Sequence, residues 1–483
     1  TVRRARDVVD AAGYTLEAVT ERVGPDVFAH LSARERAPLV RATRAGDRLD
    51  VLLRLFLIGE PVPHDDARAA LAPMAVDEWV AGGLVAVNGD EVEGLMTLRP
   101  LGGPERRLVA HDRPDRSGAV QPDHVVGVSA STVALAGATI RRPIDAAFDL
   151  GTGCGIQALH AADHSASVVA SDLNQRAVAC ATLTMELNDI GHVSVRSGDR
   201  FEPVAGEQFD LIVSNPPFVI SPSRRYLFRD SGLPLDEISR SVVGTAPQHL
   251  RDGGHCQLLA SWAHVRGQDW EDRLAGWVVG KACDVLVLER EVLDPSEHAA
   301  SWLRQTERPE RWQDEYDAWL DDCAAHGVEG VGIGLISMRK RSDSSEPCFR
   351  AESAPQDVAL DCGDHIGALF ELADFLGHVD DAALLDVSFR VAPDVVFDER
   401  RTPDADGWST VSRHLRQTAG LRHEGEVDDV IADVVGACNG DRTLRQVLAT
   451  VCAERGLPDE ELRAAALPIV RSLVGRAFVL PVG

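Results

Sequence analysis

The chain has 483 residues, 76 acidic against 49 basic side chains, a formal net charge of −27 and 45% hydrophobic residues. That apolar share is ordinary for packed cores and excludes wholesale disorder, while the length suits about three domains of roughly 150 residues. No stretch reaches the roughly 18 consecutive apolar residues that span a bilayer, and the start lacks the apolar core of a secretory signal. We therefore expect a soluble, cytoplasmic protein that does not bind membranes.

The negative charge is unevenly spread along the chain. Residues 1–110 hold 14 Arg against 17 acids, whereas residues 342–483 hold 13 Arg against 26 acids. An acidic surface repels bare nucleic acid on average, although an Arg face near the N-terminus could still engage phosphate. The nine cysteines include no C-x-x-C pair, which argues against a disulfide framework and a zinc finger.

Residues 1–110 are predicted to form a helical N-terminal domain. Helical periodicity is followed by a hairpin-like stretch at 84–98 that turns at Asn88-Gly89-Asp90. Helices are expected over residues 5–23, 33–45, 52–58, 65–71 and 76–81. The last three helices with the hairpin resemble a winged helix, a module that binds nucleic acid or protein or simply packs on a neighbour.

Residues 120–341 are predicted to form an α/β domain, because apolar strand-like runs alternate with helical segments. Such alternation favours a parallel, doubly wound sheet covered on both faces. The runs are residues 146–150, 168–173, 193–196, 209–214, 256–260, 284–288 and 331–338. A Trp-rich helical insertion, 291–329, precedes the last strand, and we expect its tryptophans to pack in a core.

A linker-like segment at 342–347 separates this domain from a mixed C-terminal region, residues 348–483. The region ends in predicted helices near 427–437, 443–455 and 459–474 and a strand at 477–481. This terminal unit also resembles a small winged helix.

A glycine-rich turn follows the first strand, in Phe148-Asp-Leu-Gly-Thr-Gly-Cys-Gly-Ile156. Its glycines, Gly151, Gly153 and Gly155, let the backbone approach a ligand closely. The spacing departs from the dinucleotide G-x-G-x-x-G, because Ile156 stands where the third glycine would be. Asp149 suits a ligand with a nearby cation, such as a sulfonium or ammonium group, better than a pyrophosphate.

Two acidic residues follow the next two strands. Asp172 lies at the end of the strand after the glycine turn, where a carboxylate can accept hydrogen bonds from ribose hydroxyls of a nicotinamide or an adenosyl ligand. Asp199 could accept from an adenine amino group, with Phe201 against the ring. The alternative for Asp199 is a helix N-cap.

The strand at 209–214 ends in Asn215-Pro216-Pro217-Phe218. Two prolines fit poorly inside a central strand, so they should lie just outside it and hold the backbone extended. The Asn215 carboxamide oxygen and the Pro216 carbonyl can each accept one hydrogen of a planar NH2 group, while Phe218 stacks on its π-face. Accepting both hydrogens localises the nitrogen lone pair, so no general base is needed before attack.

Together these residues resemble class I S-adenosylmethionine-dependent methyltransferases of the small-domain type, which include HemK/PrmC-like protein-glutamine and ribosomal-RNA guanine enzymes. The resemblance covers residues 120–341 and implies a Rossmann-like seven-stranded sheet there, and the helical, winged-helix-like terminal domains expected from their own patterns lie outside it. It implies S-adenosylmethionine contacts from Asp149, Gly151, Gly153, Gly155, Asp172 and Asp199. It also implies a catalytic clamp of Asn215, Pro216 and Phe218.

Several features depart from the resemblance or lie outside it. The insertion and the C-terminal region have no place in either group, and the glutamine enzymes usually end the motif in Tyr instead of Phe218. Arg225 and Tyr226, just past the motif, could orient the substrate or belong to a solvated lid. His160 and His164 lack the Glu of H-E-x-x-H and a third ligand, so we expect no metal site.

The expected function is S-adenosylmethionine-dependent methylation of a planar amide or exocyclic amine nitrogen by in-line displacement. Its acceptor is a protein glutamine or a nucleobase: the terminal domains favour nucleic acid, and the charge of −27 favours protein or a small molecule. The alternatives are a non-catalytic cofactor-binding regulator or scaffold and a methyltransferase of a small metabolite.

Overall fold

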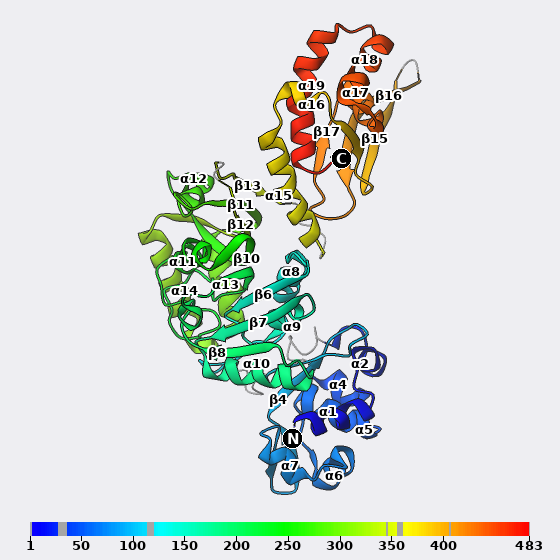
Figure 1. Cartoon of the computed structure of the whole chain (residues 1–483). Helices are drawn as coiled ribbons and strands as arrows, with labels where there is room; N and C mark the ends of the chain where they lie inside the picture. Colours follow the sequence, from blue (N-terminus) through cyan, green and yellow to red (C-terminus); the bar gives the residue numbers. More distant parts are fainter. Residues whose placement is uncertain are drawn as a thin grey trace. The chain divides into compact units, whose positions relative to one another are not determined.

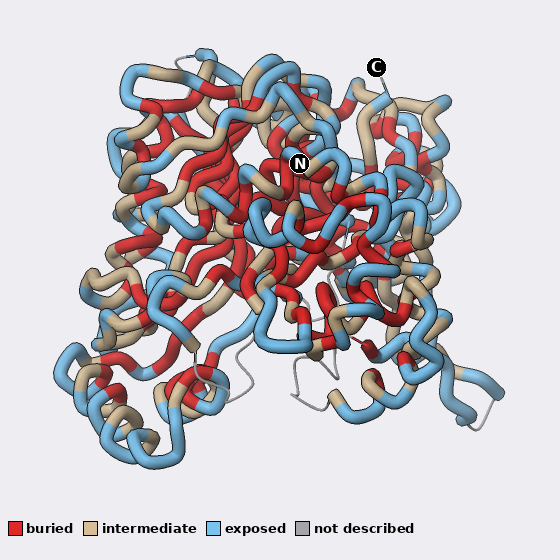
Figure 2. The backbone as a smooth tube through the Cα atoms, turned by 90° about the horizontal axis from the view of Figure 1, so that it is seen from below, coloured by how far each residue is buried: buried red, intermediate tan, exposed pale blue. Residues whose placement is uncertain are grey.

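The computed structural model describes residues 2–27, 36–113, 120–343, 346–354, 361–404 and 407–482. The chain forms two compact units. The first contains residues 1–133, 142–281 and 292–336, and the second contains 134–141, 282–291 and 337–483. Buried segments, red in Figure 2, lie inside and are bordered by exposed ones in pale blue.

The N-terminal helices are shorter than predicted. The expected helix over 5–23 is two helices, α1 (Val2–Ala11) and α2 (Leu16–Val23), because Gly13 takes a left-handed φ of 70° and the Thr15 side chain then caps α2. The expected helix over 33–45 is α4 (Ala37–Ala42), and residues 33–35 lie outside the described part.

Three helices and a small antiparallel sheet follow in the predicted order. The sheet order is β1-β3-β2, and the β2–β3 turn places Gly89 at a φ of 64°. The winged-helix assignment stays a prediction. The elements are α5 (Arg48–Leu53), the π-helical η1 (Arg54–Ile58), β1 (Val62–Pro63), α6 (His64–Leu71), α7 (Val76–Ala81), β2 (Val85–Asn88) and β3 (Glu91–Gly94).

The central sheet has eight strands in the order β13-β11-β12-β10-β9-β6-β7-β8. All seven predicted strands are present, and the eighth, β13, pairs parallel to β11. The seven-strand expectation therefore missed one strand. The strands are β6 (Ile144–Leu150), β7 (Ser165–Asp172), β8 (Val193–Ser197), β9 (Phe209–Ser214), β10 (Leu250–Val265), β11 (Cys283–Leu293), β12 (Val328–Lys340) and β13 (Phe349–Ser353).

Helices flank this sheet, with α10 beside β7 and β8 (Figure 1). The α-helices are α8 (Ala130–Ala138), α9 (Ile156–Ala161), α10 (Gln175–Leu187), α11 (Glu237–Thr245) and α12 (Trp270–Ala275), and the 3-10 turns are η2 (Glu202–Val204) and η3 (Ala246–Gln248). The predicted insertion is a pair of contacting helices, α13 (Pro295–Thr306) and α14 (Pro309–Ala325). Its Trp319 is buried with Val219 and Leu303, so the core-packing expectation is confirmed for this tryptophan.

An antiparallel ribbon, β4 (Met96–Pro100) and β5 (Leu108–Asp112), joins the N-terminal helices to α10. Leu187 of α10 belongs to the N-terminal hydrophobic core. The Asn188 side chain, just after α10, accepts from Leu108 N (3.0 Å) and donates to Leu108 O (2.7 Å). The N-terminal and methyltransferase-like parts therefore share one core inside the first unit.

The C-terminal region holds two three-stranded sheets, ordered β18-β14-β19 and β15-β16-β17. The three predicted helices and the final strand are present, and the Thr443 side chain caps the N-terminus of α18. The elements are α15 (Gly363–His378), α16 (Asp381–Leu384), β14 (Ser388–Val391), β15 (Val395–Asp404), β16 (Gly407–Gln417), β17 (Glu424–Glu426), α17 (Asp429–Gly436), β18 (Asn439–Thr443), α18 (Leu444–Arg455), α19 (Asp459–Gly475) and β19 (Val479–Val482).

Candidate active site

The register of the parallel strands brings the sequence motifs to one edge of the sheet. Leu150, the last residue of β6, pairs with Ser171 of β7 on one side and with Ser214 of β9 on the other. Asp172 pairs in turn with Ser197, the last residue of β8. Four segments therefore lie at the same edge of the sheet, where open α/β sheets bind ligands. They are the glycine turn, the turns at Asp172 and Asp199, and the Asn215 motif.

The glycine turn leaves space that a ligand can fill. Gly151, Gly153 and Gly155 all have positive φ (73°, 55° and 85°), a conformation that residues with side chains rarely adopt. A Cβ atom added at Gly151 or Gly153 would meet no described atom within 4 Å. Gly155 differs, because a Cβ there would lie 3.1 Å from the Ala181 Cα of α10. The first two glycines border open space, and the third permits close helix packing.

Asp149 is a buried carboxylate with one free oxygen. Its Oδ2 accepts from the Thr152 hydroxyl (2.6 Å) and from Ala158 N (2.9 Å), whereas Oδ1 has no hydrogen-bond partner among the described residues. Burial raises the pKa of Asp149 to about 7. A buried acceptor without a donor is costly, so the site suits a ligand that brings a cation or a donor.

Asp172 lies half-buried and anchors the glycine turn. Its Oδ2 accepts from Gly153 N and its Oδ1 from Asn174 N, both at 2.9 Å, which leaves lone pairs on both oxygens for a ligand. Burial raises the pKa of this carboxyl. The next residue, Leu173, is an apolar side chain that is 59% exposed. The sequence analysis gave Leu173 no role. An apolar residue directly after Asp172, the carboxylate expected to bind ribose, could have indicated a surface that packs against the adenine ring.

The third turn separates the two residues assigned to adenine. Asp199 is half-buried and forms an ion pair with its neighbour Arg200 (2.9 Å); it does not cap η2, whose N-cap is Phe201. The Phe201 ring is buried against His249 (centroids 4.7 Å apart) and Phe148 (6.0 Å). Phe201 therefore packs in the core, and we leave it out of the proposed adenine contact.

Asn215 and the prolines lie just beyond β9, as the proline argument predicts. The Asn215 carboxamide makes no hydrogen bond to any described residue. The Pro216 carbonyl accepts from Phe218 N (2.7 Å), so the motif folds into a tight turn instead of the extended backbone that the prolines led us to expect. The carbonyl keeps a second lone pair. The Phe218 carbonyl accepts from the Ser261 hydroxyl of β10, which ties the turn to the sheet.

The two residues assigned to the substrate are held by the insertion. Tyr226 is only 1% exposed, and its hydroxyl donates to the Thr306 carbonyl (3.0 Å). Arg225 is half-buried and pairs with Glu307 (2.9 Å). Neither side chain is free on the surface, because α13 covers this segment. Neighbouring Arg224 is exposed and has no ion-pair partner among the described residues.

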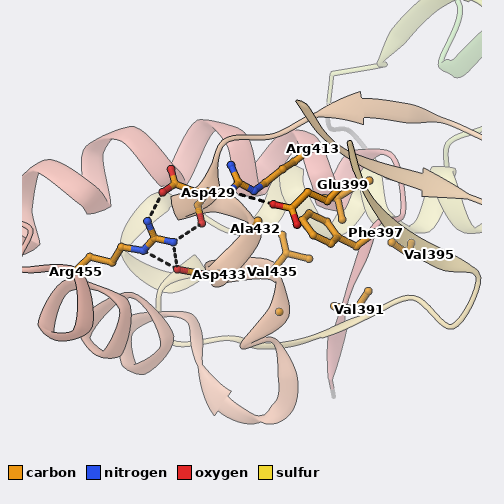
Figure 3. Close-up of a pocket in the computed structure, with 12 residues that line it drawn as sticks. Val391, Val395, Phe397, Glu399, Arg413, Asp429, Ala432, Asp433, Val435 and Arg455 are labelled. Atoms are coloured by element: carbon orange, nitrogen blue, oxygen red, sulfur yellow. Dashed lines mark hydrogen bonds and ion pairs between the residues drawn. The ribbon is translucent and has the colours of Figure 1, made fainter. Parts of the chain in front are cut away.

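A separate cavity of about 460 Å³ lies in the C-terminal region, between the β15–β16 face and α17 (Figure 3). Its apolar lining includes Phe397 and Leu415. The charges at its rim pair among themselves: Arg455 pairs with Asp429 and Asp433, and Arg413 pairs with Glu399. None of the predicted site residues lines this cavity.

Two further observations concern ligands and membranes. No group of three His, Cys, Asp or Glu residues within the described ranges is placed to hold a metal ion. The described helices include none that is both long and apolar enough to cross a bilayer.

Comparison with known families agrees with the geometry. Residues 130–268 match the family described as "Methyltransferase small domain". Two families described as domains of unknown function match residues 11–95 (DUF7059) and 367–481 (DUF7782). The central part of the chain is therefore similar to class I, S-adenosylmethionine-dependent methyltransferases of the HemK/PrmC-like type, as the resemblance implied.

Three curated relatives illustrate the match. A release factor glutamine methyltransferase of Xylella fastidiosa is 34% identical over 129 residues, 24% of this chain and 46% of the relative. A ribosomal protein uL3 glutamine methyltransferase of Bradyrhizobium diazoefficiens is 33% identical over 135 residues, covering 25% and 42%. A ribosomal RNA small subunit methyltransferase C of Idiomarina loihiensis is 31% identical over 113 residues, covering 23% and 30%. The chain thus spans less than half the length of each.

Proposed function

We propose that the protein methylates a planar nitrogen, either a protein glutamine amide or the exocyclic amine of a nucleobase, with S-adenosylmethionine as methyl donor. The observation that carries the proposal is the Asn215 carboxamide, which makes no hydrogen bond to a described residue and follows β9 at the same sheet edge as the glycine turn. Relatives named for release factor, ribosomal protein and ribosomal RNA methylation support both acceptor classes.

Each group in the proposed site has a physical role. Asp172 would accept from the ribose hydroxyls, Leu173 would pack on the base, and the Asp149 Oδ1 atom, which has no described partner, would stabilise the positive charge of the donor. The cofactor supplies an electrophilic methyl group. Asn215 and the Pro216 carbonyl accept the two hydrogens of the acceptor nitrogen, which orients its lone pair and raises its nucleophilicity.

Asn215→Ala separates binding of the cofactor from methyl transfer. We expect cofactor affinity to stay within about twofold and turnover to fall about 100-fold, because only the acceptor loses a hydrogen-bond partner. Titration calorimetry with S-adenosylmethionine and transfer of radiolabelled methyl groups measure the two effects. Gln208→Ala removes an exposed carboxamide before the opposite end of β9 and should leave both unchanged. Unchanged turnover in Asn215→Ala would remove this residue from its role.

The class of acceptor is identified by methyl transfer into a cell extract that is then treated with RNase or protease. Radiolabel transferred into a fraction that RNase leaves intact and protease destroys identifies a protein acceptor, and the reverse identifies RNA. Absence of S-adenosylmethionine binding by the wild-type protein would contradict the proposal as a whole.

A further inference from the structure

The segment that follows the Asn215 motif, residues 219–230, is held together by the buried Asp230 carboxylate, which also forms an ion pair with its neighbour Arg229. Asp230 accepts from Arg229 Nε (2.7 Å) and from the Ser221 hydroxyl (2.9 Å), and both charged side chains are fully buried. Asp230 Oδ2 also accepts from the backbone N–H groups of Arg225 and Tyr226, both at 3.0 Å. One carboxylate therefore fixes the backbone on both sides of the exposed Arg224.

The α13–α14 helix pair completes this arrangement from outside. The Arg229 guanidinium donates to the Thr306 hydroxyl at the end of α13 (2.6 Å) and lies over the rings of Tyr226 (4.9 Å) and Trp319 (5.2 Å). The ring of His298, also on α13, lies 2.9 Å from the Ile220 carbonyl. The contacts with Thr306, Trp319 and His298 join the insertion to the segment that directly follows the Asn215 motif, and the contact with Tyr226 lies within that segment.

A buried charge keeps its position only while its partners are in place, because an unpaired buried charge is far more costly than an unpaired neutral group. Arg229 has Asp230 within its own segment and Thr306 on the insertion. This guanidinium is therefore one of the groups that couple the insertion to the segment, beside the Tyr226–Thr306, Arg225–Glu307 and His298–Ile220 contacts. The exposed face of the segment presents Arg224 and Leu227, the latter 43% exposed.

We propose that the α13–α14 pair holds residues 219–230 as the acceptor-binding wall of the active site, with Arg229 and Thr306 as positioning residues. This inference rests on the proposed function and adds to it which element presents the acceptor. The Arg229–Asp230 pair does not touch the acceptor. It sets the conformation of the chain that leads out of the Asn215 motif.

Thr306→Val and Thr306→Ser test the coupling with a matched pair. Valine has the shape of threonine but leaves the Arg229 guanidinium without its hydroxyl partner, whereas serine keeps that hydroxyl. We expect trypsin to cut after Arg224 and Arg225 about tenfold faster in Thr306→Val, because cleavage follows local opening of the segment. Thr306→Ser should resist cleavage like the wild type, and mass spectrometry identifies the fragments.

Turnover and cofactor affinity are measured on the same variants. Thr306→Val and the stronger Arg229→Met should lower methyl transfer about tenfold while the S-adenosylmethionine Kd stays within about twofold. Arg266→Met removes an exposed ion pair with Glu329 and serves as the control. Unchanged cleavage, or faster cleavage with unchanged turnover, overturns the proposal. A wild-type protein that binds the cofactor but transfers no methyl group overturns the proposed function instead, and the cleavage rates tell the two failures apart.

Discussion

Asp149 carries an ionisable group whose charge a bound cation would control. Its pKa of about 7 comes mainly from burial, which disfavours the carboxylate. The folded protein therefore favours the protonated form of this side chain. The contribution of Asp149 to the free energy of unfolding falls as the pH rises from about 4 to about 7. A cation at the free Oδ1 would favour the ionised form and lower that pKa.

S-adenosylmethionine should accordingly bind more tightly as the pH rises through about 7. Below that pH the cofactor must displace a proton, and affinity is lost up to tenfold for each pH unit until the lower pKa of the complex is reached. Calorimetry at about pH 6 in buffers of different ionisation enthalpy should detect the released proton. Asp149→Asn should bind more weakly and lose this pH dependence. An equal dependence in both proteins would mean that Asp149 does not face the cation.

Single residues could be predicted from the sequence where a motif constrained them. Asp149 and Asp172 lie at the ends of predicted strands and Gly151 and Asn215 directly follow predicted strands, and the observed register brings the strand ends together. The environment of Phe201 depends on His249, which lies beyond β9 and α11 in the sequence, and no local pattern encodes that contact.

At the scale of elements, Thr184 of α10 links two parts of the first unit. Its hydroxyl accepts from Ala110 N of β5 (3.0 Å) and donates to the Cys154 carbonyl in the glycine turn (2.8 Å). Ribbon β4–β5 thus supports the turn through one buried side chain.

Thr184→Val should lower both stability and cofactor affinity. The variant leaves a buried N–H and a buried carbonyl unpaired, at a cost of about 1–3 kcal/mol for each group. Thermal unfolding and calorimetry measure the two effects. Thr182→Val, which removes an exposed hydroxyl bonded within the same helix, is the control. A loss of stability with unchanged affinity would show that Thr184 supports the fold without shaping the turn.

The strands that could be predicted from the sequence are more buried than the strands that could not. Strands β6 and β9 are apolar runs, and parallel strands covered on both faces show such runs. Strands β13 and β15 are intermediate or exposed at every position, so neither an apolar run nor alternation marks them. Helix α13 was predictable as a helix, but its contacts with Ile220 and Tyr226 were not, because α11, β10, α12 and β11 separate those residues from α13 in the sequence.

At the scale of the whole molecule, the N-terminal part is needed by the methyltransferase part. A chain that begins at residue 120 would expose Leu187, now 2% exposed, and leave Thr184 and Asn188 without their partners on β5. We expect this truncated protein to aggregate or to unfold well below the full chain. Light scattering and thermal unfolding check this, with Arg3→Ala, which removes an exposed ion pair to Asp189, as a control that should match the wild type.

The two units interleave along the chain. It passes from one to the other at residues 134, 142, 282, 292 and 337, and β13 in the second unit pairs with β11, although α13, α14 and β12 separate these two strands in the sequence. Proteins assembled by joining finished modules end to end have one junction and can be divided there. This chain has no such junction, so recombination at a single breakpoint cannot exchange either unit for another. During synthesis, the sheet gains its last strand only after Ser353 has been made. We therefore expect variation among relatives to add or remove surface segments and to leave these crossings in place.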